Sequence, residues 1–140
     1  MPEIVIATDA QSVFDEIRSV VEEPLTTVRW VRRGELVREE LNARSADLAI
    51  VDMQIGTMGG IAVALDLRLE AEAGRLDPCP VLLVLDRRPD VFLARRSGAE
   101  GWIIKPLDAL RLRVAVSALL KGGSWHDASF TPHPVAIPVK

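Results

Sequence analysis

Several residue types that mark particular classes of protein are scarce or absent in this sequence. Cys79 is the single cysteine, so the chain cannot form an internal disulfide. The formal net charge is −3, which leaves no basic excess for contacts with nucleic-acid phosphates. No apolar run approaches the roughly 20 residues that cross a bilayer. The segment MPEIVIATDA lacks a basic stretch followed by a long apolar one. We therefore expect a cytoplasmic protein that neither enters membranes nor binds nucleic acid.

Motifs for common catalytic chemistries are also missing. No serine lies in a G-x-S-x-G context, and GTMGG is not followed by the Lys-Ser/Thr of a P-loop. His126 and His133 have no cysteine or paired acid at ligand spacing, which argues against a metal site there. We therefore expect no enzyme. The 140 residues, 49% of them hydrophobic, are enough for one packed domain.

Short apolar runs alternate with amphipathic segments along most of the chain. Strands are predicted at 4–7, 26–31, 48–51, 81–85 and 101–104. Helices are predicted at 12–23, 34–43, 61–73, 90–96 and from the cap at Asp108 to about Lys121. The first, third and fourth runs are apolar at every position, as strands covered by helices on both faces must be. The alternation predicts an α/β fold with a doubly wound, five-stranded parallel sheet.

In such a sheet, function gathers at the carboxyl ends of the strands, near the point where strand order reverses. The residues that follow the predicted strands include two acids and a lysine, Asp9, Asp52 and Lys105, with Thr8 and Leu85 beside them. Carboxylates can bind a hard divalent cation, and a carboxylate near such a cation and a lysine can attack phosphorus. This set is therefore the candidate chemical site.

At these positions the chain is similar to receiver domains of bacterial two-component response regulators, which have the flavodoxin-like (βα)5 fold. The resemblance covers about residues 3–121 and is carried by Asp9, Asp52 and the segment GWIIKP with Lys105-Pro106. It implies that Asp52 is the phosphoacceptor and that Lys105 contacts the phosphoryl group. It also implies that Mg²⁺ binds Asp9, Asp52 and the main-chain carbonyl of Gln54. The Lys105-Pro106 bond would be cis, and the phosphoryl donor would be a histidine kinase or a small acyl phosphate.

Several positions depart from the family pattern. Thr8 replaces an acid, which predicts weak Mg²⁺ binding. Leu85 replaces a serine or threonine whose hydroxyl would contact the phosphoryl group, and Trp102 replaces a switchable Tyr or Phe. Gly56 and Gly59 replace a proline and an acid in the loop after Asp52, which predicts a looser loop.

These departures leave alternatives open. In the first, phosphorylation of Asp52 switches a protein-binding face. In the second, the chain is an atypical receiver that binds partners independently of phosphorylation. A structural role for Asp52 alone and a flavin-binding flavodoxin-like protein are remoter alternatives. The arginine- and valine-rich composition without tyrosine resembles stand-alone actinobacterial receivers. Some receivers of that kind are similar to accessory proteins of respiratory complex I, which implies a larger complex as one class of partner.

The segment after the predicted last helix is different in composition from the rest of the chain. We expect a receiver-like domain over 1–121 and an extended tail over 122–140. Three prolines prevent the tail from forming a helix, and it is too short for a DNA-binding output domain. Trp125, Phe130 and Ile137 make it too apolar for a plain linker, so they are candidate partner-binding residues. The tail could instead fold back on its own domain or be disordered.

Overall fold

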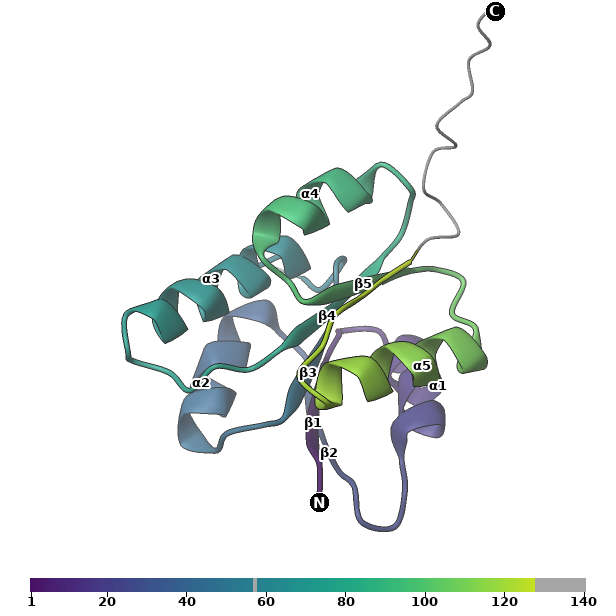
Figure 1. Ribbon diagram of the computed structural model, residues 1–140, viewed down its shortest axis with the longest axis horizontal. Helices are drawn as coiled ribbons and strands as arrows, with labels where there is room; N and C mark the ends of the chain where they lie inside the picture. The colour runs from purple at the N-terminus through teal and green to yellow at the C-terminus, as the bar shows by residue number, and fades with distance from the viewer. Residues whose placement is uncertain (57, 128–140) are drawn as a thin grey trace, which may run out of the picture.

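The centre of the molecule is a parallel sheet (Figure 1). The structure is a computed structural model and describes residues 1–56 and 58–127. Within these residues the strands are β1 (Glu3–Ala7), β2 (Thr27–Val31), β3 (Leu48–Asp52), β4 (Val81–Leu85), β5 (Gly101–Ile104) and β6 (Trp125–His126). Their order across the sheet is β2-β1-β3-β4-β5-β6. Because every pairing is parallel, the carboxyl ends of all the strands lie at one edge.

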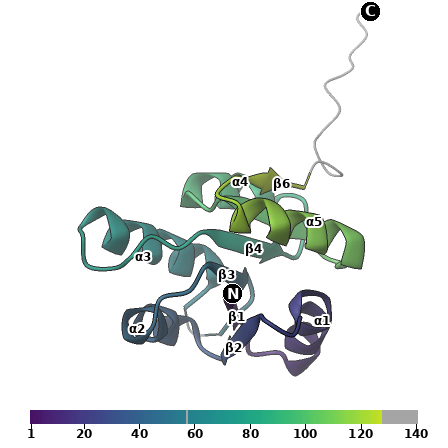
Figure 2. The same ribbon diagram turned by 60° about the horizontal axis from the view of Figure 1, so that its bottom comes forward.

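Helices cover both faces of this sheet (Figure 2). They are α1 (Gln11–Val21), α2 (Val37–Ala43), α3 (Gly60–Glu72), α4 (Asp90–Ser97) and α5 (Ala109–Leu120), and a 3-10 turn (η1, Gly34–Leu36) precedes α2. Helices α1 and α5 pack on one face, whereas α2, α3 and α4 pack on the other. The α5 helix begins where expected, since the Asp108 side chain accepts a hydrogen bond from the Leu110 backbone N–H at 2.8 Å.

Alternation along β3 shows why this sheet needs two covered faces. Leu48 and Ile50 pack in the core beneath α1 and α5, whereas Ala49 and Val51 pack in the core beneath α2, α3 and α4. All four side chains are fully buried. A strand with one wet face would expose every second residue, so the unbroken apolar run specifies a central position in the sheet. The expected doubly wound α/β architecture is confirmed.

The structure differs from the expected fold in the number of strands. We expected five, and the described residues contain a sixth, β6, which pairs in parallel with β5. Gly122, at φ +85°, turns the chain back after α5, so the residues after it return along the edge of the sheet. A strand of two residues is too short to leave a periodic signal. The segment expected to be a helix at 34–43 begins with the 3-10 turn.

Among the described residues, no helix combines the length and apolarity needed to cross a membrane. Cys79 is partly buried and packs against the core beneath α2, α3 and α4. Burial, with smaller contributions from the charges of Glu100 and Asp47, raises the pKa of its thiol to about 12. Cys79 therefore behaves as a small apolar packing residue, since the reactive thiolate is scarce at neutral pH.

Candidate functional site

Polar side chains gather at the carboxyl edge of the sheet, around the point where strand order reverses. The chain leaves the adjacent strands β1 and β3 toward opposite sides of the sheet, and such reversal points are where α/β sheets commonly bind their ligands. Thr8 and Asp9 follow β1, and Asp52 is the last residue of β3. Asp86 follows β4, and Lys105 follows β5. Four strands thus supply the side chains of one site.

Asp52 is held by donors from three directions. Its side chain is only 2% exposed. The hydroxyl of the fully buried Thr8 donates to Asp52 Oδ2 at 2.7 Å. The Gln54 backbone N–H donates to Asp52 Oδ1 at 3.1 Å, and Lys105 Nζ donates to the same oxygen at 3.2 Å. A buried carboxylate is costly unless its oxygens are hydrogen-bonded, and these three bonds meet that need.

Lys105 lies between two carboxylates. Its Nζ is 3.2 Å from Asp52 Oδ1 and 3.0 Å from Asp86 Oδ1. Burial acts to lower the pKa of Lys105, but the hydrogen bonds and charges of Asp86 and Asp52 outweigh it and raise that pKa above its ordinary value. The ammonium therefore stays charged at neutral pH. The peptide bond that follows, Lys105-Pro106, is cis.

Asp9 contacts the loop after β3. Its Oδ2 accepts a hydrogen bond from the Gly56 backbone N–H at 3.0 Å. A Cβ at position 56 would lie 2.9 Å from the same oxygen, and a Cβ at Gly60 would lie 2.7 Å from the Asp52 carbonyl oxygen. The glycines at 56 and 60 therefore permit close approaches, one of the loop to Asp9 and one of α3 to the end of β3. This packing role adds to the loop flexibility that we expected from the sequence.

Comparison with known proteins decides the family. A family model for the response regulator receiver domain matches residues 4–117. The chain belongs to this family. A response regulatory protein of Mycobacterium tuberculosis is 36% identical over 99 residues, which cover 70% of this chain and 71% of that protein. The response regulator protein PmrA of Pseudomonas aeruginosa is 29% identical over 118 residues, covering 84% of this chain and 52% of PmrA.

Solved structures agree with this assignment. The signal receiver domain of a signal transduction histidine kinase from Syntrophus aciditrophicus has a TM-score of 0.77 and 25% identity, and the match covers 99% of this chain and 98% of that one. A two-component response regulator of the LuxR family from Aurantimonas shares the fold, with a TM-score of 0.80, 19% identity and coverage of 93% and 92%. The resemblance found in the sequence is confirmed. The flavin-binding alternative is not favoured.

Two departures from the receiver pattern have visible structural consequences. Leu85 is fully buried in the core and offers no hydroxyl to the site. Trp102 is 4% exposed, and its ring stacks on His126 from β6 at a centroid distance of 4.1 Å. Rotation of the Trp102 ring would therefore require the loss of this stacking. The two positions that the sequence predicts as switch positions are therefore a buried leucine and an indole stacked on His126.

The proposed metal ligands of this domain are few in number, and all of them are hard oxygen donors. Receiver domains typically bind Mg²⁺ at the phosphorylation site. In the described part of this chain, no group of three or more His, Cys, Asp or Glu side chains is placed to hold a metal. Asp9, Asp52 and the Gln54 carbonyl would offer two carboxylates and one carbonyl, and all three are oxygen donors of the kind that Mg²⁺ accepts while keeping several waters. The chemistry of the set fits the ion, and its small charge predicts weak binding.

The structure reveals two carboxylates whose roles the sequence did not indicate. Asp86, which directly follows β4, pairs with Lys105. Asp127 lies beyond the region of family resemblance, and its side chain is 1% exposed. Asp127 Oδ2 accepts a hydrogen bond from the Ile104 backbone N–H at 3.0 Å and pairs with Arg111. Both roles depend on contacts between distant segments, which no local pattern encodes.

The candidate partner-binding residues of the tail separate into two groups. Trp125 is partly buried in β6, and its carbonyl oxygen would be 2.6 Å from a Cβ at Gly101, so the glycine admits β6 to the edge of β5. The packed structure thus continues past the boundary expected at 121. Phe130 and Ile137 lie outside the described residues, and their role stays a prediction.

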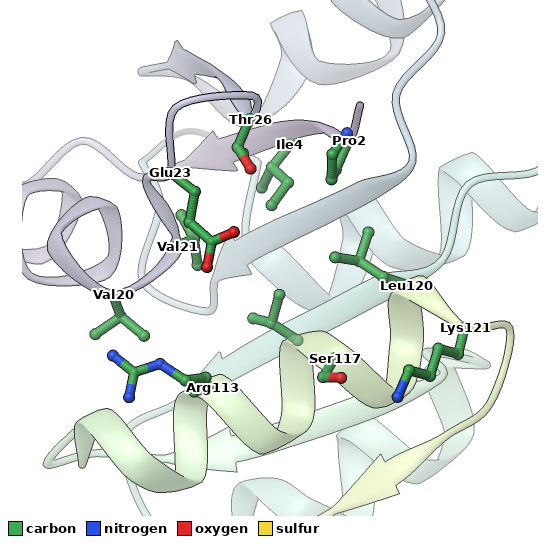
Figure 3. A pocket seen from close by; sticks show the side chains of 11 residues that line it. Pro2, Ile4, Val20, Val21, Glu23, Thr26, Arg113, Ser117, Leu120 and Lys121 are labelled. Carbon is green, nitrogen blue, oxygen red and sulfur yellow. The ribbon is translucent and has the colours of Figure 1, made fainter.

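A surface groove of about 330 Å³ lies far from this site (Figure 3). Its walls come from the start of β1, the end of α1 and the second half of α5, with Ile4, Val21, Arg113 and Lys121 among the lining residues. Those segments meet at the amino edge of the sheet, opposite the edge that holds Asp52. The groove therefore has no part in the chemistry at the carboxyl edge.

Proposed function

We propose that this receiver domain accepts a phosphoryl group on Asp52 and acts through contact with other proteins. The observation that carries the proposal is the 3.2 Å approach of Lys105 Nζ to Asp52 Oδ1 at the edge where strand order reverses. The donor would be a histidine kinase or a small acyl phosphate. The protein would act in the cytoplasm, without catalysing a metabolic reaction and without contacting nucleic acid.

The chemistry needs only one bond exchange at the site. A carboxylate oxygen of Asp52 attacks the phosphorus of an acyl phosphate, the bond from phosphorus to the acyl oxygen breaks, and the carboxylate anion leaves. Lys105 supplies a positive charge beside the attacked phosphoryl group. Mg²⁺, when bound through Asp9, Asp52 and the Gln54 carbonyl, would offset further negative charge on the phosphoryl oxygens. The Gln54 N–H and the Thr8 hydroxyl orient the carboxylate for the attack.

A second candidate function is partner binding that does not depend on phosphorylation. The observations that favour it are the buried Leu85, which cannot donate to a phosphoryl oxygen, and the stacking of Trp102 on His126. Both features oppose the movement by which a phosphoryl group would reshape the β4 and β5 ends of the sheet. In this case Asp52 would be a structural residue within an interaction module.

Intact-mass spectrometry after incubation with acetyl phosphate and Mg²⁺ separates the two candidates. We expect the wild type to gain one phosphoryl group and Asp52→Ala to gain none. Asp77→Asn is a matched control, because Asp77 is an exposed acid before β4, at the amino edge of the sheet. It should behave as the wild type does. If the wild type gains no more phosphoryl mass than Asp52→Ala does, the first candidate is refuted and the second remains.

A further inference from the structure

Asp86 is a carboxylate at the site for which the proposed chemistry has no use. It follows β4 directly and is 23% exposed. Its Oδ1 accepts from Lys105 Nζ at 3.0 Å, a shorter contact than the 3.2 Å from Lys105 to Asp52. Its Oδ2 is buried and has no hydrogen-bond partner among the described residues. A carboxylate with one unsatisfied oxygen contributes little to stability, so its position calls for a different explanation.

We propose that Asp86 restrains Lys105 and slows phosphoryl transfer to Asp52. The inference rests on the proposed function of Asp52 and concerns the regulation of that same site. Lys105 shares its ammonium between two carboxylates, so it must give up the contact with Asp86 to follow the phosphoryl group. The Asp86 charge also repels an incoming phosphate dianion, because like charges at short range raise the energy of approach.

The arrangement of charges explains why the restraint falls on Lys105. Asp52 is also bonded by Thr8 and Gln54, whereas Lys105 Nζ is the one hydrogen-bond donor to Asp86 among residues 1–56 and 58–127. Loss of the Asp86 charge would leave Lys105 with Asp52 as its sole carboxylate neighbour at hydrogen-bond distance in the described structure.

Two variants separate charge from size at this position. Asp86→Asn keeps the shape and the Oδ1 acceptor but removes the charge, and Asp86→Ala removes both. We expect each variant to take phosphoryl from acetyl phosphate about tenfold faster than the wild type, which corresponds to about 1.4 kcal/mol of barrier. Asp77→Asn should keep the wild-type rate. A gain with Asp86→Ala alone would indicate crowding and would overturn the proposal, as would unchanged rates in both variants.

A second measurement tests the restraint without phosphorylation. The chain has three lysines, Lys105, Lys121 and Lys140. Brief labelling with acetic anhydride modifies accessible amines, and peptide mass spectrometry then compares Lys105 with the exposed Lys121 in the same sample. We expect the ratio of Lys105 to Lys121 labelling to rise in Asp86→Asn and Asp86→Ala, because the Lys105 side chain is released from the ion pair that holds its Nζ 3.0 Å from Asp86 Oδ1.

The two measurements also distinguish failure of this inference from failure of the proposed function. If neither the wild type nor either variant is phosphorylated, the proposed function is refuted, and the labelling ratio alone decides whether Asp86 restrains Lys105. If the ratio is unchanged, the restraint is refuted whatever the phosphorylation result. A higher ratio with unchanged phosphorylation rates would mean that the ion pair exists without slowing transfer, and this too overturns the proposal.

Discussion

Two buried aspartates near the end of β5 show how partners determine what a carboxylate does. Asp52 and Asp127 are 2% and 1% exposed, and each pairs with a cation of similar exposure, Lys105 at 26% and Arg111 at 28%. Asp127 is bonded by the Ile104 backbone N–H as well as by Arg111. Arg111 in turn donates to the Pro106 carbonyl oxygen at 3.0 Å. Asp52, in contrast, shares its cation with the competing carboxylate of Asp86.

The difference separates a structural ion pair from one that can change. The Ile104 backbone N–H and the planar Arg111 guanidinium both bond Asp127 from fixed directions, so its geometry is rigid. A lysine on a flexible stem between two acids has two nearly equal partners, so a small change in charge can redistribute it. The residues on either side of Lys105 are held by the rigid pair, because Ile104 bonds Asp127 and Pro106 bonds Arg111. Lys105 itself can shift between its two carboxylates.

The largest effect should come from removal of the structural pair. Asp127→Ala leaves the Arg111 guanidinium and the Ile104 N–H without their carboxylate, and we expect a loss of about 3 kcal/mol in the free energy of unfolding. Urea denaturation measures it. Asp77→Asn should change the free energy by less than about 0.5 kcal/mol, as surface substitutions do. A loss below about 1 kcal/mol for Asp127→Ala would show that water replaces the carboxylate and that the pair is not structural.

A smaller loss is expected at the adjustable pair. In Asp52→Ala, Lys105 keeps Asp86 at 3.0 Å, and the Thr8 hydroxyl keeps its bond from the Ala10 backbone N–H. We therefore expect the free energy of unfolding to fall by only about 1 kcal/mol, mostly from lost hydrogen bonds. The same urea series measures this value. A loss equal to that of Asp127→Ala would mean that the two clusters are equally rigid and that the contrast is wrong.

The smallest expected effect is a pH dependence that only the lysine pair should show. Because the folded pKa of Lys105 is raised, its contribution to stability is complete below the unfolded value near 10.5 and is lost as pH rises through the folded pKa. The difference in unfolding free energy between wild type and Lys105→Met, expected below about 1 kcal/mol, should therefore shrink at alkaline pH. The difference for Arg111→Met should stay constant, since a guanidinium remains charged.

One other group that titrates in this range cancels from the comparison. Burial raises the pKa of the Cys79 thiol to about 12 in the folded protein. The thiol therefore lowers the free energy of unfolding as pH rises above its unfolded pKa near 9.0. It does so equally in the wild type and in both variants. A shrinking difference for Arg111→Met as well would show that alkaline pH loosens the whole domain, and the specific role of Lys105 would then be refuted.

The sequence predicts those parts of the molecule that depend on repeated local patterns. Unbroken apolar runs such as 48–51 predict central strands, and the parallel order that follows places Asp52 and Lys105 at one edge. It could not predict β6, because two residues carry no period. It also could not predict the contacts of Asp86 and Asp127, since each depends on the register of strands far apart in the chain. The roles of Asp52, Lys105 and Asp9 in phosphorylation stay predictions.

The short β6 strand has a consequence for self-association. Without it, the apolar and uncharged β5 segment GWII would form the margin of the sheet with its backbone N–H and C=O groups unpaired. Such a margin can template strand addition by a second molecule, and proteins protect it with very short edge strands. By pairing just two residues, β6 covers this margin with a very short edge strand. Chains cut before residue 122 would therefore be the ones most prone to aggregate.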